Sequence, residues 1–219
     1  MRMRPKHLAM ALSKLKPHPC ADVSLEQYAT EGDLAAYWML AVDELDGMDG
    51  RVVADLGAGN GILGVACLML GASHVHFVEC DKAALEVLGQ NLASLDASLQ
   101  DCWTVHSSTI GTDPLDLTGV DIVVMNPPWG VQTAKADRPF LHAAFTSPAS
   151  AIHLLHSDRA THVAALGNDH GWDNEAVLRT TFRLPPLYAH HAKRTASTDV
   201  QCWRFHRPGD ARLPSEDEA

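Results

Sequence analysis

Apolar and polar positions along the chain follow a repeating order, in which a short apolar run is followed by a segment with helical spacing. The apolar runs predict strands over residues 51–56, 74–81, 102–107, 120–126 and 150–157. Helices are predicted up to Gly71 and over residues 82–95, 139–148 and 158–171. Strands that alternate with helices in this way indicate a mostly parallel sheet with helices on both faces.

The last two apolar runs depart from this order. They occupy residues 175–184 and 198–206, with no helical pattern between them, and therefore predict an antiparallel hairpin at the edge of a seven-stranded sheet. No internal repeat or low-complexity linker divides the chain, so we expect a single domain over 1–219. Within it we expect a basic N-terminal extension over 1–24 and a disordered acidic tail over 208–219.

Composition narrows the class of protein. A chain of 219 residues that is 46% hydrophobic and 20% charged suits a globular core and does not suit disorder. No apolar run is long enough for a membrane span, and no secretory cleavage pattern follows the basic N-terminus, so we expect a cytoplasmic protein. Neither a disulfide framework nor a metal site is expected, because no CxxC occurs among Cys20, Cys67, Cys80, Cys102 and Cys202.

Charge is distributed unevenly. The net charge is −10, yet residues 1–16 hold five basic residues and no acid, and residues 176–207 hold six basic residues and one acid. If the two basic ends meet in space, they form a local positive patch that attracts a polyanion such as nucleic acid. An acid-rich surface that simply aids solubility is the alternative interpretation.

A glycine-rich turn, "DLGAGNG", joins the first strand to the first helix. Gly57, Gly59 and Gly61 allow the backbone to approach a ligand at the carboxyl edge of the sheet, where NAD or S-adenosylmethionine binds in such folds. The second strand ends at Glu79, whose carboxylate can accept from both hydroxyls of a ribose. Asp81 could do the same, or it could cap the following helix.

A stiff loop, Asn126-Pro127-Pro128-Trp129, follows the fourth strand. Prolines have no N–H and a nearly fixed φ, and the residue before a proline is held extended. The loop therefore presents backbone carbonyls, one amide and one large ring, which suits a planar group that carries an NH₂. A rigid turn without chemistry is the alternative.

These motifs together resemble class I S-adenosylmethionine-dependent methyltransferases that act on exocyclic or amide nitrogen and have a Rossmann-like fold. The segments "LEQYATEGDLAAYWML", "MNPPWG" and "LPPLYAHHAKRTASTDVQCWRF" further resemble the methyltransferase-like protein 5 family. That resemblance covers residues 25–205. It implies an adenine-N6 methyltransferase of small-subunit ribosomal RNA that works as a heterodimer with a small zinc-binding activator protein.

The resemblance also implies roles by position. It assigns cofactor contacts to Gln27, Tyr28, Thr30, Asp55, Gly57, Gly59, Asn60, Ile62, Glu79, Cys80, Ser107, Ser108 and Asn126. The family often ends its third strand with an acid, where this chain has Ser107 and Ser108, and it usually has Phe where this chain has Trp129. RNA contacts are expected from the loop between the last two strands, at His190, His191, Lys193 and Arg194, although an ordinary solvated hairpin tip would have the same composition.

The proline loop suggests a mechanism. The side-chain oxygen of Asn126 and the carbonyl of Pro127 would accept the two N6 hydrogens of adenine, while Trp129 stacks on the base. The sulfonium of S-adenosylmethionine would supply the methyl group, so no metal is required. Two alternatives remain open from the sequence: methylation of a glutamine N5 in a protein, and a cofactor-binding scaffold without catalysis.

Overall fold

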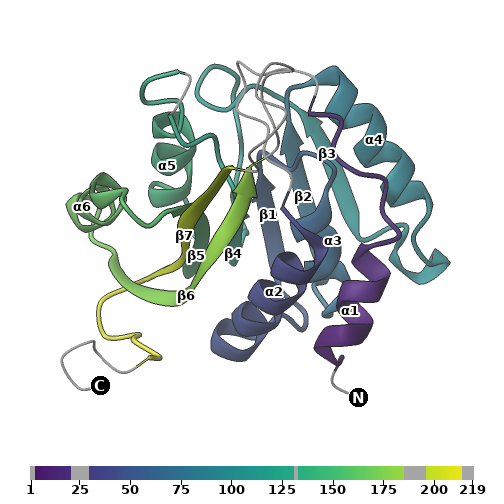
Figure 1. The fold of residues 1–219 in the computed structure, drawn as a ribbon, viewed down its shortest axis with the longest axis horizontal. Helices are drawn as coiled ribbons and strands as arrows, with labels where there is room; N and C mark the ends of the chain where they lie inside the picture. The colour runs from purple at the N-terminus through teal and green to yellow at the C-terminus, as the bar shows by residue number, and fades with distance from the viewer. Residues whose placement is uncertain (1–2, 21–29, 131–132, 185–195, 214–219) are drawn as a thin grey trace.

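The computed structural model describes residues 3–20, 30–130, 133–184 and 196–213 (Figure 1). At its centre lies a seven-stranded sheet in the order β3-β2-β1-β4-β5-β7-β6. Its strands are β1 (Val52–Leu56), β2 (His74–Glu79), β3 (Trp103–Ser107), β4 (Ile122–Met125), β5 (Ala151–Ser157), β6 (Asp173–Leu184) and β7 (Ala196–His206).

Strands β1 to β5 are parallel, and β7 is antiparallel to both β5 and β6. The predicted mostly parallel sheet with an antiparallel edge hairpin is therefore confirmed. Asp55 of β1 lies beside Phe77 of β2 and Val124 of β4. This register brings the residues that follow β1, β2 and β4 to one edge of the sheet.

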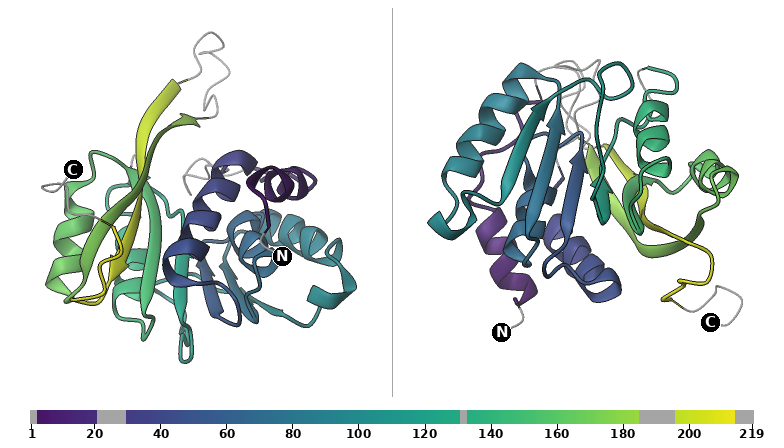
Figure 2. Two further views of the ribbon diagram at one scale, coloured as in Figure 1. Left: turned by 90° about the horizontal axis from the view of Figure 1, so that it is seen from below. Right: turned by 180° about the vertical axis from the view of Figure 1, so that it is seen from behind.

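Helices cover the two faces of the sheet in separate groups (Figures 1 and 2). One buried cluster joins α1, α2, α3 and α4 to the sheet, and a second joins α5 and α6 to the opposite face. The helices are α1 (Pro5–Leu12), α2 (Gly32–Asp46), α3 (Ile62–Met69), α4 (Lys82–Ala93), α5 (Arg138–Phe145) and α6 (Thr161–Asp169), with a short 3-10 helix at Ala97–Leu99.

Helices α1 and α2 lie outside the segments for which the apolar pattern predicted helices. Pro5 occupies the first turn of α1, where its missing N–H costs no hydrogen bond. Leu8 and Leu12 lie four residues apart on one side of α1, and both are fully buried in the core. The basic N-terminal segment thus contributes apolar packing as well as charge. Residues 21–24 and 214–219, at the ends of the two predicted terminal segments, lie outside the described residues.

The connection between β3 and β4, residues 108–121, is described throughout and contains no helix. In β2, Val75 and Phe77 are buried beneath α3 and α4, and the alternating His74 and His76 point to the opposite face. There His76 Nδ1 lies 3.1 Å from Nε2 of His106 in β3. Within the described structure, this part of the sheet therefore has one helix-covered face and one half-exposed, histidine-rich face.

The β6–β7 hairpin is longer than its neighbour β5. Val200 of β7 pairs with Ser157, the last residue of β5, and the residues from Ala196 to Asp199 pair with β6 alone. Figure 2 shows the hairpin extending beyond the rest of the sheet as a two-stranded ribbon. The ribbon leads to residues 185–195, which are outside the described structure.

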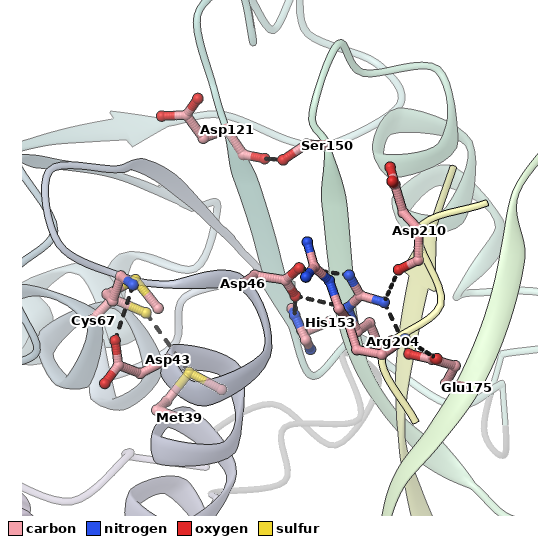
Figure 3. Close-up of polar contacts among 12 residues, drawn as sticks. Met39, Asp43, Asp46, Cys67, Asp121, Ser150, His153, Glu175, Arg204 and Asp210 are labelled. Carbon is pink, nitrogen blue, oxygen red and sulfur yellow. Dashed lines mark hydrogen bonds and ion pairs between the residues drawn. The ribbon is translucent and has the colours of Figure 1, made fainter. Parts of the chain in front are cut away.

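A buried polar network fastens the C-terminal end of α2 to β5 and β7 (Figure 3). Arg204 donates two hydrogen bonds to Asp46, from Nη2 at 2.6 Å and from Nε at 2.8 Å, and a third to Glu175 at 2.8 Å. His153 Nε2 lies 2.8 Å from the same Asp46 carboxylate. Burial alone would raise the pKa of Asp46, but hydrogen bonds from Arg204 and His153 hold it well below its usual range. Because all four side chains are buried or nearly so, the network fixes the end of α2 against the sheet, while the start of α2 lies next to Thr30 at the carboxyl edge.

None of the described helices combines the length and the apolar character that a membrane span requires.

Candidate active site

A cavity of about 390 Å³ opens at the carboxyl edge of the sheet, between the ends of β1, β2 and β4 and the start of α5. Many of the predicted cofactor residues line it, namely Thr30, Asp55, Gly57, Gly59, Asn60, Ile62, Glu79, Cys80 and Asn126. Ser107 and Ser108 are not among the lining residues; Thr109 and Ile110, the next two along the chain, are. The predicted contacts Gln27 and Tyr28 lie outside the described residues, as do His190, His191, Lys193 and Arg194.

The glycine-rich turn forms the floor of the cavity. Gly57 and Gly59 have φ values of +74° and +57°, a backbone conformation that other residues rarely adopt. A Cβ at Gly57 would lie 2.9 Å from the ring of Phe140, and one at Gly59 would lie 2.6 Å from the ring of His18. The turn therefore requires glycine for conformation and for space, and it is packed beneath two rings that come from distant segments.

Asp55 supports this turn from inside the core. Its side chain is almost fully buried, and Oδ2 accepts a hydrogen bond from the backbone N–H of Gly64 at 2.9 Å. Burial raises the pKa of Asp55 to about 7, although the Gly64 bond acts in the opposite direction. The carboxyl group thus joins the end of β1 to the first turn of α3 and holds the loop between them.

Glu79 and Asp81 have different roles. The Glu79 carboxylate accepts from the backbone N–H of Gly59 at 2.8 Å through Oε2, and from Cys80 and Asp81 at 2.8 and 2.9 Å through Oε1. It is held rigidly and lines the cavity. Asp81 instead caps α4, since its side chain accepts from the backbone N–H groups of residues 83 and 84. The sequence left both acids as candidates for the ribose, whereas in the structure Glu79 lines the cavity and Asp81 caps the helix.

The proline loop presents Asn126 at the cavity with a fixed orientation. Trp129 Nε1, which can only donate, lies 3.2 Å from Asn126 Oδ1. The other end of the amide, Nδ2, donates to Thr30 Oγ1 at 3.1 Å. The indole donor therefore identifies the amide oxygen, and the Thr30 hydroxyl can accept from the NH₂ group at the other end. Pro128 also lines the cavity, and Pro127 is buried behind it.

Several lining residues were not predicted, among them His18, Ile110 and Phe140. Burial lowers the pKa of His18, although Glu79 and Asp81 act against this, so the neutral imidazole is favoured above the glycine turn. No linear motif contains these residues. The amphipathic pattern of α5 was the available signal for Phe140, but it does not tell which residue at the start of a helix turns toward a ligand.

The chain is similar to known proteins over most of its length. The family model of the methyltransferase small domain matches residues 32–158. An uncharacterized protein of Methanocaldococcus jannaschii is 30% identical, over 94% of this chain and 96% of that protein. The rRNA N(6)-adenosine-methyltransferase METTL5 of Danio rerio is 27% identical, over 93% of this chain and 99% of that protein. A crystal structure from Pyrococcus horikoshii, of a protein described as a candidate RNA methyltransferase, is 36% identical with a TM-score of 0.82, over 94% and 99% of the two chains.

Proposed function

This chain belongs to the methyltransferase small domain family, and on that premise we propose that it transfers a methyl group from S-adenosylmethionine to N6 of an adenine in RNA. The resemblance to the methyltransferase-like protein 5 family is confirmed by relatives of that name that align along most of the chain. The observation that carries the proposal is the amide of Asn126, oriented by Thr30 and Trp129 at the mouth of the cavity.

The cavity suits the proposed cofactor. Its volume of about 390 Å³ is within the range of ligand pockets. The backbone at Gly57 and Gly59 allows close approach of a ligand. The Glu79 carboxylate accepts twice through Oε1 and once through Oε2, so a lone pair of Oε2 can accept from a ribose hydroxyl. When bound, S-adenosylmethionine supplies an electrophilic methyl group on a sulfonium, which needs no activation by the protein.

The proline loop would activate the nucleophile. The lone pair of adenine N6 is delocalised into the ring, and an acceptor for each N6 hydrogen favours a more pyramidal, more nucleophilic nitrogen. The side-chain oxygen of Asn126, which has two lone pairs and accepts from Trp129, would also accept one N6 hydrogen. The Pro127 carbonyl would accept the other. As the N–C bond forms, the S–C bond breaks, and the methylated nitrogen then loses one proton to solvent.

The prolines and the indole prepare this geometry before the substrate arrives. Pro127 and Pro128 restrict the backbone, which reduces the reorganisation needed at the moment of transfer. Trp129 donates its own N–H to the acceptor oxygen; the residue is 8% exposed and is not among those that line the cavity. A base that has left its own stack would then stack on the indole.

We further propose small-subunit ribosomal RNA as the substrate and a small zinc-binding activator protein as the partner. Support for the partner comes from the edge strand β3, whose outer side pairs with no described strand, and from the adjacent histidine-rich face without a helix. An exposed strand edge is a template for a strand of another chain. Co-expression with the activator should therefore give a heterodimer that binds cofactor more tightly than the isolated chain.

The test of the reaction is a methyl-transfer assay with labelled S-adenosylmethionine. Substrates are total RNA and total protein from cells that lack the gene, and the labelled products are digested to nucleosides and amino acids. We expect label in N6-methyladenosine, and its loss in Asn126→Ala while calorimetry still detects cofactor binding. Label in protein glutamine, or none at all despite bound cofactor, would replace the proposal with protein methylation or with a scaffold.

A further inference from the structure

A cluster of three titratable side chains adjoins Trp129 through the ring of His156. Asp137 comes from the start of α5, His156 from β5, and His162 from the first turn of α6. Asp137 Oδ2 lies 2.5 Å from His162 Nε2 and 3.4 Å from His156 Nε2. The side chains of Asp137 and His156 are 3% and 2% exposed, and that of His162 is 36% exposed. The mechanism proposed above uses none of the three.

The tautomer of His156 decides what the cluster can do. Its Nδ1 accepts a hydrogen bond from the backbone N–H of Ser157 at 2.9 Å, so the proton of the neutral ring is on Nε2. That proton occupies the nitrogen through which a metal ion would bind, although the three side chains are of ligand type and close enough to one another. The geometry therefore favours a carboxylate bonded to the ring of His162, with Nε2 of His156 3.4 Å away and in no hydrogen bond of its own.

This arrangement keeps Asp137 charged. Burial alone would raise the pKa of Asp137, but the polar contacts with His156 and His162 lower it to about 2. A buried, ionised carboxylate attracts both imidazoles and limits the rotation of each ring. The cluster is thus a rigid joint between α5, β5 and α6.

The joint contacts the catalytic loop at two points. The ring of His156 lies against the indole of Trp129, with 6.0 Å between centroids and 30° between planes. Asp137 itself ends the segment that begins at Trp129. Gly130 lies close to the backbone of Lys135, two residues before Asp137.

We propose that Asp137 is a positioning residue for the transfer reaction, which holds His156 behind Trp129 and so fixes the plane on which the target base stacks. The inference rests on the proposed adenine methylation, because a stacked base is the substrate that such a platform serves. His162 is the solvent-side partner that keeps the Asp137 carboxylate in place. Asp137 touches neither substrate nor cofactor in this role.

The test combines a substrate-free readout with steady-state kinetics. The emission of Trp129 is obtained as the difference between each protein and its Trp129→Phe counterpart. We expect Asp137→Asn to shift this emission to longer wavelength, and to raise KM for RNA about tenfold, the order expected from a lost base–aromatic stack. The KM for S-adenosylmethionine should stay unchanged. His162→Gln should give the same changes in smaller measure.

Asp46→Asn is the matched control, since Asp46 is also a carboxylate bonded to a buried histidine but belongs to the separate network around Arg204. It should leave both the Trp129 emission and the KM for RNA unchanged at a temperature where all variants are folded. In a Trp129→Ala background, Asp137→Asn should add less than twofold to KM. A small effect there is expected only if Asp137 acts through the indole.

Several results would overturn the inference: an unchanged Trp129 emission, a fully additive double variant, or an equal rise of KM in Asp46→Asn. A stoichiometric metal ion that binds the wild type but not His162→Gln would assign the cluster to metal binding instead. If the wild type methylates no adenine, the proposed function fails. The emission measurement, which needs no substrate, then still decides whether Asp137 positions Trp129.

Discussion

The hydroxyl of Thr30 accepts a hydrogen bond from the side-chain amide of Asn126, with 3.1 Å between Oγ1 and Nδ2 and 96 positions between the two residues in the sequence. The bond joins the segment before α2 to the loop after β4. It leaves the amide oxygen directed toward Trp129 and the substrate side of the cavity. The N-terminal part of the chain therefore takes part in orienting the central acceptor of the proposed reaction.

Replacing Thr30 by Val keeps the shape of the side chain and removes the acceptor. We expect kcat to fall about tenfold, because an unsatisfied buried polar group costs about 1–3 kcal/mol and the amide regains a partner by turning away from its catalytic orientation. Thr30→Ser, which keeps the hydroxyl, should retain most of the activity. The measurement is kcat at saturating RNA and cofactor. Equal rates for the Val and Ser variants would contradict the orienting role.

Trp129 contributes a ring and a donor, and two substitutions separate them. Trp129→Phe keeps a stacking surface but loses the N–H to Asn126, so we expect kcat to fall several-fold while KM for RNA changes little. Trp129→Ala also loses the stack, which is worth about 1–3 kcal/mol per base, so KM for RNA should rise as well. Single-turnover and steady-state rates with one RNA substrate provide the comparison. A Phe variant as impaired in KM as the Ala variant would contradict the stacking role.

Glu79 should determine affinity for the cofactor. Glu79→Gln has only one acceptor oxygen where the carboxylate receives three backbone N–H groups, and its NH₂ would oppose at least one of them. Hydrogen bonds to a charged group are worth about 1.5–3 kcal/mol, so we expect the Kd for S-adenosylmethionine to rise at least tenfold. Asp81→Asn is the control, because Asn caps a helix as well as Asp does. Calorimetry that finds the same affinity loss in both variants would remove the distinction between the two acids.

Asp55 should make stability depend on pH in an unusual direction. Its pKa is about 7 in the folded protein and near the ordinary value of 3.8 when exposed, so between these values the folded state binds the extra proton. Its contribution is therefore lost as pH rises, by about 1.4 kcal/mol per pH unit within that window. Asp55→Asn keeps an acceptor for Gly64 and lacks the titration. The measurement is urea unfolding of both proteins from pH 4 to 8. As pH rises, the free energy of unfolding of the wild type should fall relative to that of Asp55→Asn. A constant difference between the two proteins would contradict this prediction.

The network around Arg204 should carry a large share of stability. Arg204→Met removes the cation from a site where it is 2% exposed and leaves Asp46 and Glu175 without their partner. Breaking a buried pair in this way costs about 3–5 kcal/mol, so we expect a marked drop in the urea midpoint. Thr30, which lines the cavity, directly precedes α2. Loosening of this helix should therefore also weaken cofactor affinity at urea concentrations near the midpoint of unfolding. An unchanged urea midpoint would show that the network contributes little to the free energy of unfolding.

The sequence predicted the strands and the linear motifs because each depends on neighbouring residues. The apolar run before Gly57 and the proline loop after Met125 specify their own local structure, and parallel pairing then brings them to one edge. Helix α1 was missed, since its apolar residues 8–12 form one short continuous run without helical spacing, in a basic segment. Asp137, His156 and His162 were missed for a different reason: they meet only when α5, β5 and α6 pack together. The spacing of residues within a single helix or strand does not predict such a cluster.

The part of the β6–β7 hairpin that extends beyond β5 determines how far from the sheet a ligand can contact it. Four residues of β7, Ala196–Asp199, continue past the end of β5, and at about 3.3 Å per residue they reach on the order of 13 Å beyond it. A long polymer whose reactive unit enters the cavity would meet this arm several units away. The hairpin can then act as a gauge, which accepts only those targets whose flanking segment has the right shape at that range.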